Sequence, residues 1–197
     1  LKPLNPTCIV VGKDFHFGHQ RAGNIHVLGQ HFKTHIVEDI NYHGKKVSSS
    51  ACRDYLSTGD IPMVSQLIGR PFHASGIVRH GQHLGRKLGY PTANIHAKHY
   101  LLSGIFAGYV ILPNRRFHIA AISIGHRPMA PLNHGIMEAH LLDFDGDLYG
   151  QRLNVVFCKK IRDQIKLSDF EELKTQMHKD TQNIRTFFKH AKYSFLD

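Results

Sequence analysis

From Phe72 onward the chain consists of apolar runs of five to ten residues separated by Gly, Pro or Asn turns. Several runs alternate apolar and polar residues, as Arg116–Ile122 (RFHIAAI) does, and a period of two is typical of strands with one buried face. Short connections such as Pro113-Asn114 and Asp145-Gly146 favour hairpins over helical crossovers. The sequence therefore predicts an antiparallel β-barrel or sandwich. The expected strands are His73–His80, Gly104–Leu112, Phe117–Ile124, Ile136–Phe144 and Leu153–Ile161.

The last segment, Ser168–His190, has apolar residues at helical spacing and two glutamates in its first turn. We expect a C-terminal helix that packs on the strands, with a break near Thr181. The apolar positions are Phe170, Leu173, Met177, Ile184 and one of Phe187 or Phe188.

The first 70 residues have a mixed α/β pattern of strand, loop, helix, strand and helix, which is typical of doubly wound domains. Two strands cannot form a sheet that covers itself, so we expect residues 1–70 to be the tail of a larger α/β domain. Residues 71–190 then form the strand domain with its helix, and residues 191–197 a tail. The segments are Thr7–Val11 and His35–Ile40 as strands, Gln20–Phe32 with helical character, and a helix opened by Ser48–Ser50 that stops at Gly59.

The formal net charge is +10 and the pI is about 9.7, which favours anionic partners. The cations are scattered, with no basic block and no interleaved aromatic residues of the kind found in single-strand binders. We therefore favour a phosphorylated small molecule, and keep a basic barrel that binds nucleic acid as a weaker alternative.

Histidines and cysteines give no metal or disulfide pattern. The 17 histidines include the pairs His16/His19 and His80/His83, but these lie beside glycines in expected loops, whereas zinc sites need ligands at defined spacing. The three cysteines are odd in number and far apart, no signal-peptide pattern begins the chain, and no apolar run approaches the roughly 18 residues of a membrane span. We expect a soluble, cytoplasmic protein with reduced thiols and no membrane partner.

The most informative stretch is Gly76–Asn94, GIVRHGQHLGRKLGYPTAN. A glycine-rich backbone can approach phosphates closely, cations neutralise them, and a threonine hydroxyl is a common Mg²⁺ ligand beside them. The same composition also fits a long hairpin loop, and it matches neither the Walker pattern nor the dinucleotide fingerprint. Composition alone leaves the two interpretations equally open. The residues concerned are Gly81, Gly85 and Gly89, Arg86 and Lys87, and the Pro91-Thr92 step.

The order of residues inside this stretch resembles the loop of riboflavin kinases, which transfer the γ-phosphate of ATP to riboflavin and release FMN. The matching residues are Gly85-Arg86-x-Leu88-Gly89-Tyr90 followed by Pro91-Thr92-Ala93-Asn94. The resemblance implies a Greek-key barrel, and it implies that Thr92 and Asn94 hold the ATP phosphates and Mg²⁺. The loop glycines, Arg86 and Lys87 would then lie at the phosphates.

A second block, Met137–Phe144 continuing to Asp147-Leu148-Tyr149-Gly150, is similar to another motif of that family. Phosphoryl transfer to an alcohol needs a group that accepts or orients the hydroxyl proton, and the family's catalytic carboxylate corresponds to Glu138. On the residues alone, Glu138 is more readily a solvent-facing strand residue. Asp143, Asp145 and Asp147 lack the terminal Glu of a calcium loop, and we interpret them as turn formers.

The resemblance extends over Phe72–Arg185 and includes Gly104-Ile105-Phe106-Ala107 and Ile124-Gly125-x-Arg127-Pro128. The helix Glu171–Asp180 borders the flavin in this family, so Leu173 and Gln176 are the expected flavin contacts. His126 and Met129 replace the usual threonines, and Leu167-Ser168 replaces Phe-Asp. These departures keep open a flavin-binding or regulatory module without catalysis.

Residues 10–24 and 47–53 are similar to the FMN adenylyltransferase domain of the bacterial bifunctional enzymes, which converts FMN to FAD. Ser50 and Cys52 depart from its Ser-Ser-Thr-x-Ile-Arg motif, and a serine N-cap with a surface arginine explains this stretch equally well. We interpret His16–His19 as a coincidental match to the His-x-Gly-His motif. Without the ATP-binding histidines, this chain is not expected to form FAD, although a full-length parent would. The expected adenylyltransferase remnant comprises Asp14, Phe15, Gly18, Ser48, Ser49 and Arg53.

Overall fold

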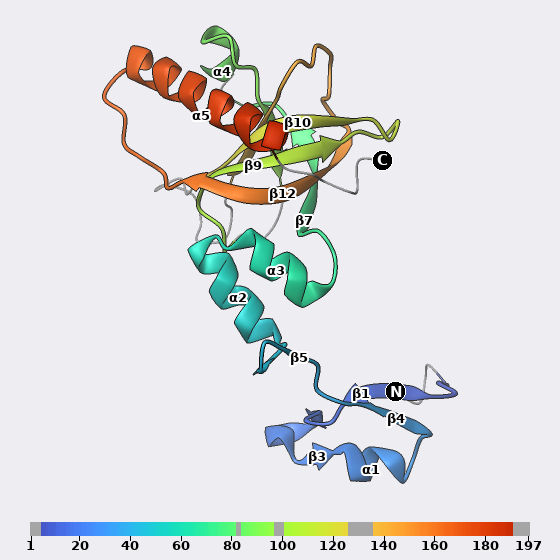
Figure 1. The fold of residues 1–197 in the computed structure, drawn as a ribbon. Helices are drawn as coiled ribbons and strands as arrows, with labels where there is room; N and C mark the ends of the chain where they lie inside the picture. Colours follow the sequence, from blue (N-terminus) through green and yellow to red (C-terminus); the bar gives the residue numbers. More distant parts are fainter. Residues whose placement is uncertain (1–4, 82–83, 97–100, 126–135, 191–197) are drawn as a thin grey trace. The chain divides into compact units, whose positions relative to one another are not determined.

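The computed structural model describes residues 5–81, 84–96, 101–125 and 136–190, and the chain divides into two compact units, Leu1–Ser48 and Ser49–Asp197 (Figure 1). Each unit is described by itself. No helix within the described ranges is long and apolar enough to cross a membrane.

The second unit contains a closed six-stranded barrel in which every neighbouring pair is antiparallel, in the order β10-β11-β8-β7-β12-β9. This confirms the expected barrel. The shortest strand, β8, was not expected, because four residues after a proline carry little periodic signal. The strands are β7 (His73–Arg79), β8 (Ala93–His96), β9 (Gly104–Ile111), β10 (Phe117–Gly125), β11 (Ile136–Leu141) and β12 (Arg152–Arg162).

The alternation along β10 decides which side chains fill the barrel. Ala120, Ile122 and Ile124 are buried in the main core cluster. The residues that alternate with them, Ile119, Ala121 and Ser123, face outward. At Gly108 in β9, a Cβ would overlap the carbonyl of Val156 in β12, so only glycine permits this close approach of the two strands.

A long helix, α5 (Phe170–His190), lies across the outer face of β9, β10 and β12 (Figure 1). A second apolar cluster holds it there, centred on Ala107, Leu142 and Ile184, with Phe187 packed against it. The break expected near Thr181 is wrong, because the Thr181 hydroxyl donates to the carbonyl of Met177 at 2.8 Å inside a continuous helix.

Residues before the barrel form two helices, α2 (Ser49–Thr58) and α3 (Ile61–Ile68). The Asp60 side chain caps α3 by accepting the N–H of Met63 at 3.2 Å. Ile61 is fully buried in the barrel's core cluster. The boundary between compact units therefore falls at Ser48, and residues 49–70, expected with the first domain, pack with the barrel.

The first unit contains a two-stranded parallel sheet of β1 (Ile9–Gly12) and β4 (Thr34–Val37), joined through a short helix, α1 (Ile25–Gly29). Asn24 caps this helix by accepting the N–H groups of His26 and Val27. A parallel strand–helix–strand unit is the pattern that the sequence predicts. The remaining elements are β2 (His16–Phe17), a 3₁₀ turn η2 (His19–Arg21), β3 (Gly23–Asn24), β5 (Asn41–Tyr42) and β6 (Lys45–Lys46).

Candidate active site

The segment that leads into β8 begins with a short helix, α4 (Leu84–Lys87), and turns back after it. The N–H of Tyr90 donates to the carbonyl of Gly85 at 2.8 Å, and a Cβ at Gly85 would overlap the carbonyl of Tyr90. Gly89 adopts a left-handed conformation with φ of 85°. A Cβ at Gly81 would overlap the Asn94 side-chain amide. Close packing at Gly81 and Gly85 and the left-handed backbone at Gly89 therefore favour glycine at these positions.

Glu138 lies on the outer face of the barrel, because its neighbours Met137 and Ala139 point into the core. It stands directly opposite Asn94 of β8 on one side and Ser123 of β10 on the other. Residues paired in this way share one face of a sheet, so the register brings two of the predicted site residues together.

A pocket of about 270 Å³, here called the helix pocket, lies between this outer face and α5. The barrel contributes Thr92, Ser123, Glu138 and His140, and α4 contributes Gly85. The helix side is formed by Leu173, Met177, Asp180 and Thr181.

A second pocket of about 480 Å³, here called the turn pocket, lies between the loop before β8 and the turn after β11. Arg86 and Thr92 line one side of it, and residues 144–149 line the other. Thr92 lines both pockets and so stands at the wall between them.

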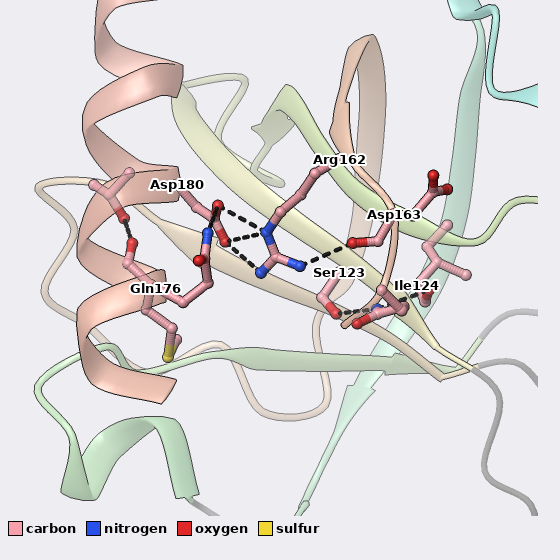
Figure 2. A network of polar contacts seen from close by, with 9 residues as sticks. Ser123, Ile124, Arg162, Asp163, Gln176 and Asp180 are labelled. Atoms are coloured by element: carbon pink, nitrogen blue, oxygen red, sulfur yellow. Dashed lines mark hydrogen bonds and ion pairs between the residues drawn. The ribbon is translucent and has the colours of Figure 1, made fainter. Parts of the chain in front are cut away.

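A polar network joins β12 to α5 at the helix pocket (Figure 2). The Arg162 guanidinium donates to both carboxylate oxygens of Asp180, with Nε at 2.9 and 3.1 Å and Nη2 at 2.6 Å. Gln176 adds a bond from Nε2 to Asp180 Oδ1 at 2.8 Å. Since the Asp180 side chain is only 6% exposed, these donors compensate a nearly buried charge. Beside them, the Gln164 amide donates to Ser123 Oγ and to the carbonyl of Ile124.

Two titratable groups at the end of β11 have shifted pKa values. Burial lowers the pKa of His140, whose Nδ1 lies 2.8 Å from the carbonyl oxygen of Pro91. Hydrogen bonds from Arg185 at 2.7 and 2.8 Å lower the pKa of Asp143. Burial thus favours the neutral form of the imidazole, and the arginine favours the charged form of the carboxylate.

The structure brings together Thr92, Asn94 and Glu138 on the adjacent strands β8 and β11 and the turn before β8. Arg86 lines the turn pocket and Leu173 the helix pocket, whereas Lys87 lines neither. Gln176 bonds to Asp180 and is absent from the lining of both pockets.

Ser168 donates its N–H and hydroxyl to Glu172 at the start of α5. Asp147 accepts the N–H of Tyr149, as a turn former does. His126 and Met129 lie outside the described residues.

Sequence reasoning missed six polar residues of the helix pocket. Asp180 carried a signal, because it stands three residues after Met177 and four before Ile184, on the apolar face of the helix. His140 lies two residues after Glu138 and so shares its face of the strand. Arg162 and Gln164 had no comparable signal. The six residues are Ser123, His140, Arg162, Gln164, Asp180 and Thr181.

The expected adenylyltransferase remnant is divided between the two units. In the first unit, Lys46 pairs with Asp14 at 2.9 Å and lowers the pKa of its carboxyl, Phe15 stacks on Phe17 with centroids 5.8 Å apart, and Gly18 has φ of 78°. Ser48 ends that unit. Ser49 and Arg53 belong to α2 of the second unit.

Similarity to known proteins also divides the chain into two parts. A family model described as riboflavin kinase matches residues 68–188, and one described as FAD synthetase matches residues 1–51. Among curated relatives, the bifunctional riboflavin kinase/FMN adenylyltransferase of Haemophilus influenzae is 37% identical over 192 residues, which are 94% of this chain and 62% of the relative. The protein of the same name from Pseudomonas fluorescens is 39% identical over 178 residues, or 86% and 57% of the two chains.

A crystal structure described as a macrolide-efflux protein from Streptococcus pneumoniae superposes with a TM-score of 0.73 and 28% identity, over 93% of this chain and 62% of that one. The fold is therefore shared with that protein. The chain spans 57% to 62% of the length of the two curated relatives. Since the riboflavin kinase model matches well over half of its residues, the chain belongs to the riboflavin kinase family.

Proposed function

We propose that this chain transfers the γ-phosphate of ATP to the 5′-hydroxyl of riboflavin, giving FMN and ADP. The observation that carries the proposal is the position of Thr92 at the wall between two pockets, with Arg86 in one and Glu138 in the other. In-line transfer needs a phosphate donor and an alcohol acceptor on opposite sides of the transferred group.

On the nucleotide side, the turn pocket would receive the ATP phosphates, and Arg86 would offset their negative charge, with Lys87 adding to the field of the loop. Thr92 and Asn94 would hold Mg²⁺, since a hydroxyl and an amide oxygen suit a hard cation that keeps substrate phosphates among its ligands. When bound, the ion would neutralise charge that develops on the phosphates. No group of three or more His, Cys, Asp or Glu side chains that could hold a metal by itself occurs in the described ranges.

On the flavin side, the helix pocket would receive riboflavin with its ribityl end toward Thr92 and its ring against Leu173. Glu138 would accept the proton of the 5′-hydroxyl as that oxygen attacks the γ-phosphorus, and the bond to the β,γ-bridging oxygen of ATP breaks. Gln176 would act on the same side by orienting Asp180, to which its amide donates.

Glu138→Gln tests this assignment, because it keeps the size and removes the acceptor. We expect FMN formation, followed by chromatography, to fall by about a hundredfold or more, with riboflavin binding retained in calorimetric titration. Glu38→Gln is a matched control in the other unit, where Glu38 is 82% exposed. Wild-type turnover in Glu138→Gln would remove Glu138 from the mechanism, and absence of FMN from the wild-type chain would favour a non-catalytic flavin-binding module.

We further propose that residues 1–48 come from an FMN adenylyltransferase domain, supported by the FAD synthetase match at residues 1–51. FMN and FAD formation should therefore be assayed separately, with this chain and with a full-length relative. We expect both proteins to form FMN and only the full-length relative to form FAD. Formation of FAD by this chain would contradict the proposal.

A further inference from the structure

The Pro91-Thr92 step lies just beyond the backbone ladder that joins β8 to β11. The last paired residues are Ala93 and Ala139, and the next pair in register would be Thr92 with His140. In place of a ladder bond, the His140 side chain lies with Nδ1 2.8 Å from the carbonyl oxygen of Pro91. Because a carbonyl only accepts, Nδ1 must carry the proton and donate it.

The imidazole is itself held from the loop side. Tyr90 packs edge-on against His140 with ring centroids 5.3 Å apart. Its hydroxyl lies 3.2 Å from Nδ1 of His178 on α5, and its N–H donates to Gly85. Tyr90 therefore links the His140 ring on the barrel strand to His178 on the helix.

We propose that His140 is a positioning residue for phosphoryl transfer, which holds the Pro91 carbonyl and thereby keeps Thr92 at the wall between the two pockets. This proposal rests on the proposed kinase function. It gives that function a further residue, which does not itself touch the reacting groups. Burial lowers the pKa of His140 and so favours the neutral ring, in agreement with a role as a hydrogen-bond donor of fixed tautomer.

Two substitutions separate the hydrogen bond from the volume of the ring. Asn places an amide N–H close to the position of Nδ1, whereas Leu fills similar space without a donor. We expect His140→Leu to lower kcat and raise KM for ATP, by about ten- to a hundredfold in kcat/KM, because a small displacement near the reacting atoms has effects of that size. His140→Asn should recover most of the loss. Failure of Asn to recover more activity than Leu would overturn the proposal.

A second readout is independent of catalysis. Amide hydrogen exchange of a peptide covering residues 84–95 should be faster in His140→Leu than in wild type, and near wild type in His140→Asn. His96→Leu is the matched control, since His96 is an exposed histidine on β8 that lines neither pocket, and its exchange and activity should be unchanged. Equal exchange in wild type and His140→Leu would refute the positioning role, even if FMN is formed. A wild-type chain that forms no FMN would refute the kinase function, and the exchange data would still decide the role of His140.

Discussion

At the scale of single residues, His140 and Asp143 both have a lowered pKa, but the physical cause differs between them. The pKa of His140 is lowered mainly because burial disfavours the imidazolium, whereas that of Asp143 is lowered mainly because Arg185 bonds to the carboxylate. In both cases the unfolded state binds protons more readily than the folded state. Each group therefore contributes stability that is lost as the pH falls, below about 6.5 for the histidine and below about 3.9 for the aspartate.

The histidine contribution predicts a pH dependence of stability. At pH values below 6.5 and above the lowered folded pKa, residue 140 is protonated in the unfolded state and neutral in the folded one, so the free energy of unfolding should fall as the pH is lowered. Urea unfolding of wild type and His140→Asn between pH 8 and pH 5 should show a stability difference that shrinks toward acid. Parallel curves for wild type and His140→Asn would contradict the shift.

At the scale of secondary-structure elements, α5 is held by apolar packing and by one nearly buried ion pair. Ile184 is fully buried in the outer cluster, and Arg162 of β12 binds Asp180 through three hydrogen bonds (Figure 2). A buried pair of this kind adds little net stability compared with apolar residues, but removal of one partner leaves an uncompensated charge. The pair therefore fixes the position of the helix against the strand.

Asp180→Ala should lower the free energy of unfolding by about 3 kcal/mol, because the Arg162 guanidinium would stay in the helix pocket without its carboxylate. Urea denaturation monitored by circular dichroism measures this change. Asp143→Ala is the matched control, because it also breaks an ion pair with a residue of α5, Arg185. The Asp143 side chain is 72% exposed, so this change should lower the free energy of unfolding much less. Similar losses in the two variants would show that burial does not distinguish the pairs.

At the scale of the whole molecule, the compact units and the family matches divide the chain at different places. The division into units falls at Ser48, whereas the riboflavin kinase model begins at residue 68 and the FAD synthetase model ends at residue 51. The helices between these limits, α2 and α3, contact each other, and α3 contacts β12. Physically they belong to the barrel unit, because Ile61 is fully buried in its core.

Two fragments test this division. A fragment of residues 49–197 should unfold cooperatively and form FMN at close to the rate of the whole chain. A fragment of residues 72–197 loses Ile61 and exposes the core surface that α3 covers, so its unfolding midpoint in urea should be clearly lower. Equal midpoints for the two fragments would show that α3 is dispensable and would place the boundary near residue 70.

Much of the fold was predictable because its signals are local. Alternation identified β10 and β12, and the apolar spacing of Phe170–His190 identified α5. The four residues of β8 were missed, because a short strand is defined by its neighbours β7 and β11 more than by its own pattern. The break expected at Thr181 was wrong, because a threonine hydroxyl can bond back to the preceding turn without ending the helix.

In the candidate site, too, some residues were predictable from the sequence, whereas the contacts between them were not. Thr92, Asn94 and Glu138 were singled out by motif, but their adjacency comes from the β8–β11 register. The contacts between His140 and Pro91, and between Arg162 and Asp180, join residues on separate elements, so no local pattern reports them.

The sequence by itself determined most of the antiparallel strands, the C-terminal helix and the loop with its motif residues, because periodicity, turn residues and glycine act over a few neighbouring positions. Only the tertiary structure decided that Thr92 lines two pockets, that His140 contacts the carbonyl of Pro91, and that α3 contributes to the barrel core. These features depend on strand register and on burial, which are set by contacts between distant segments of the chain.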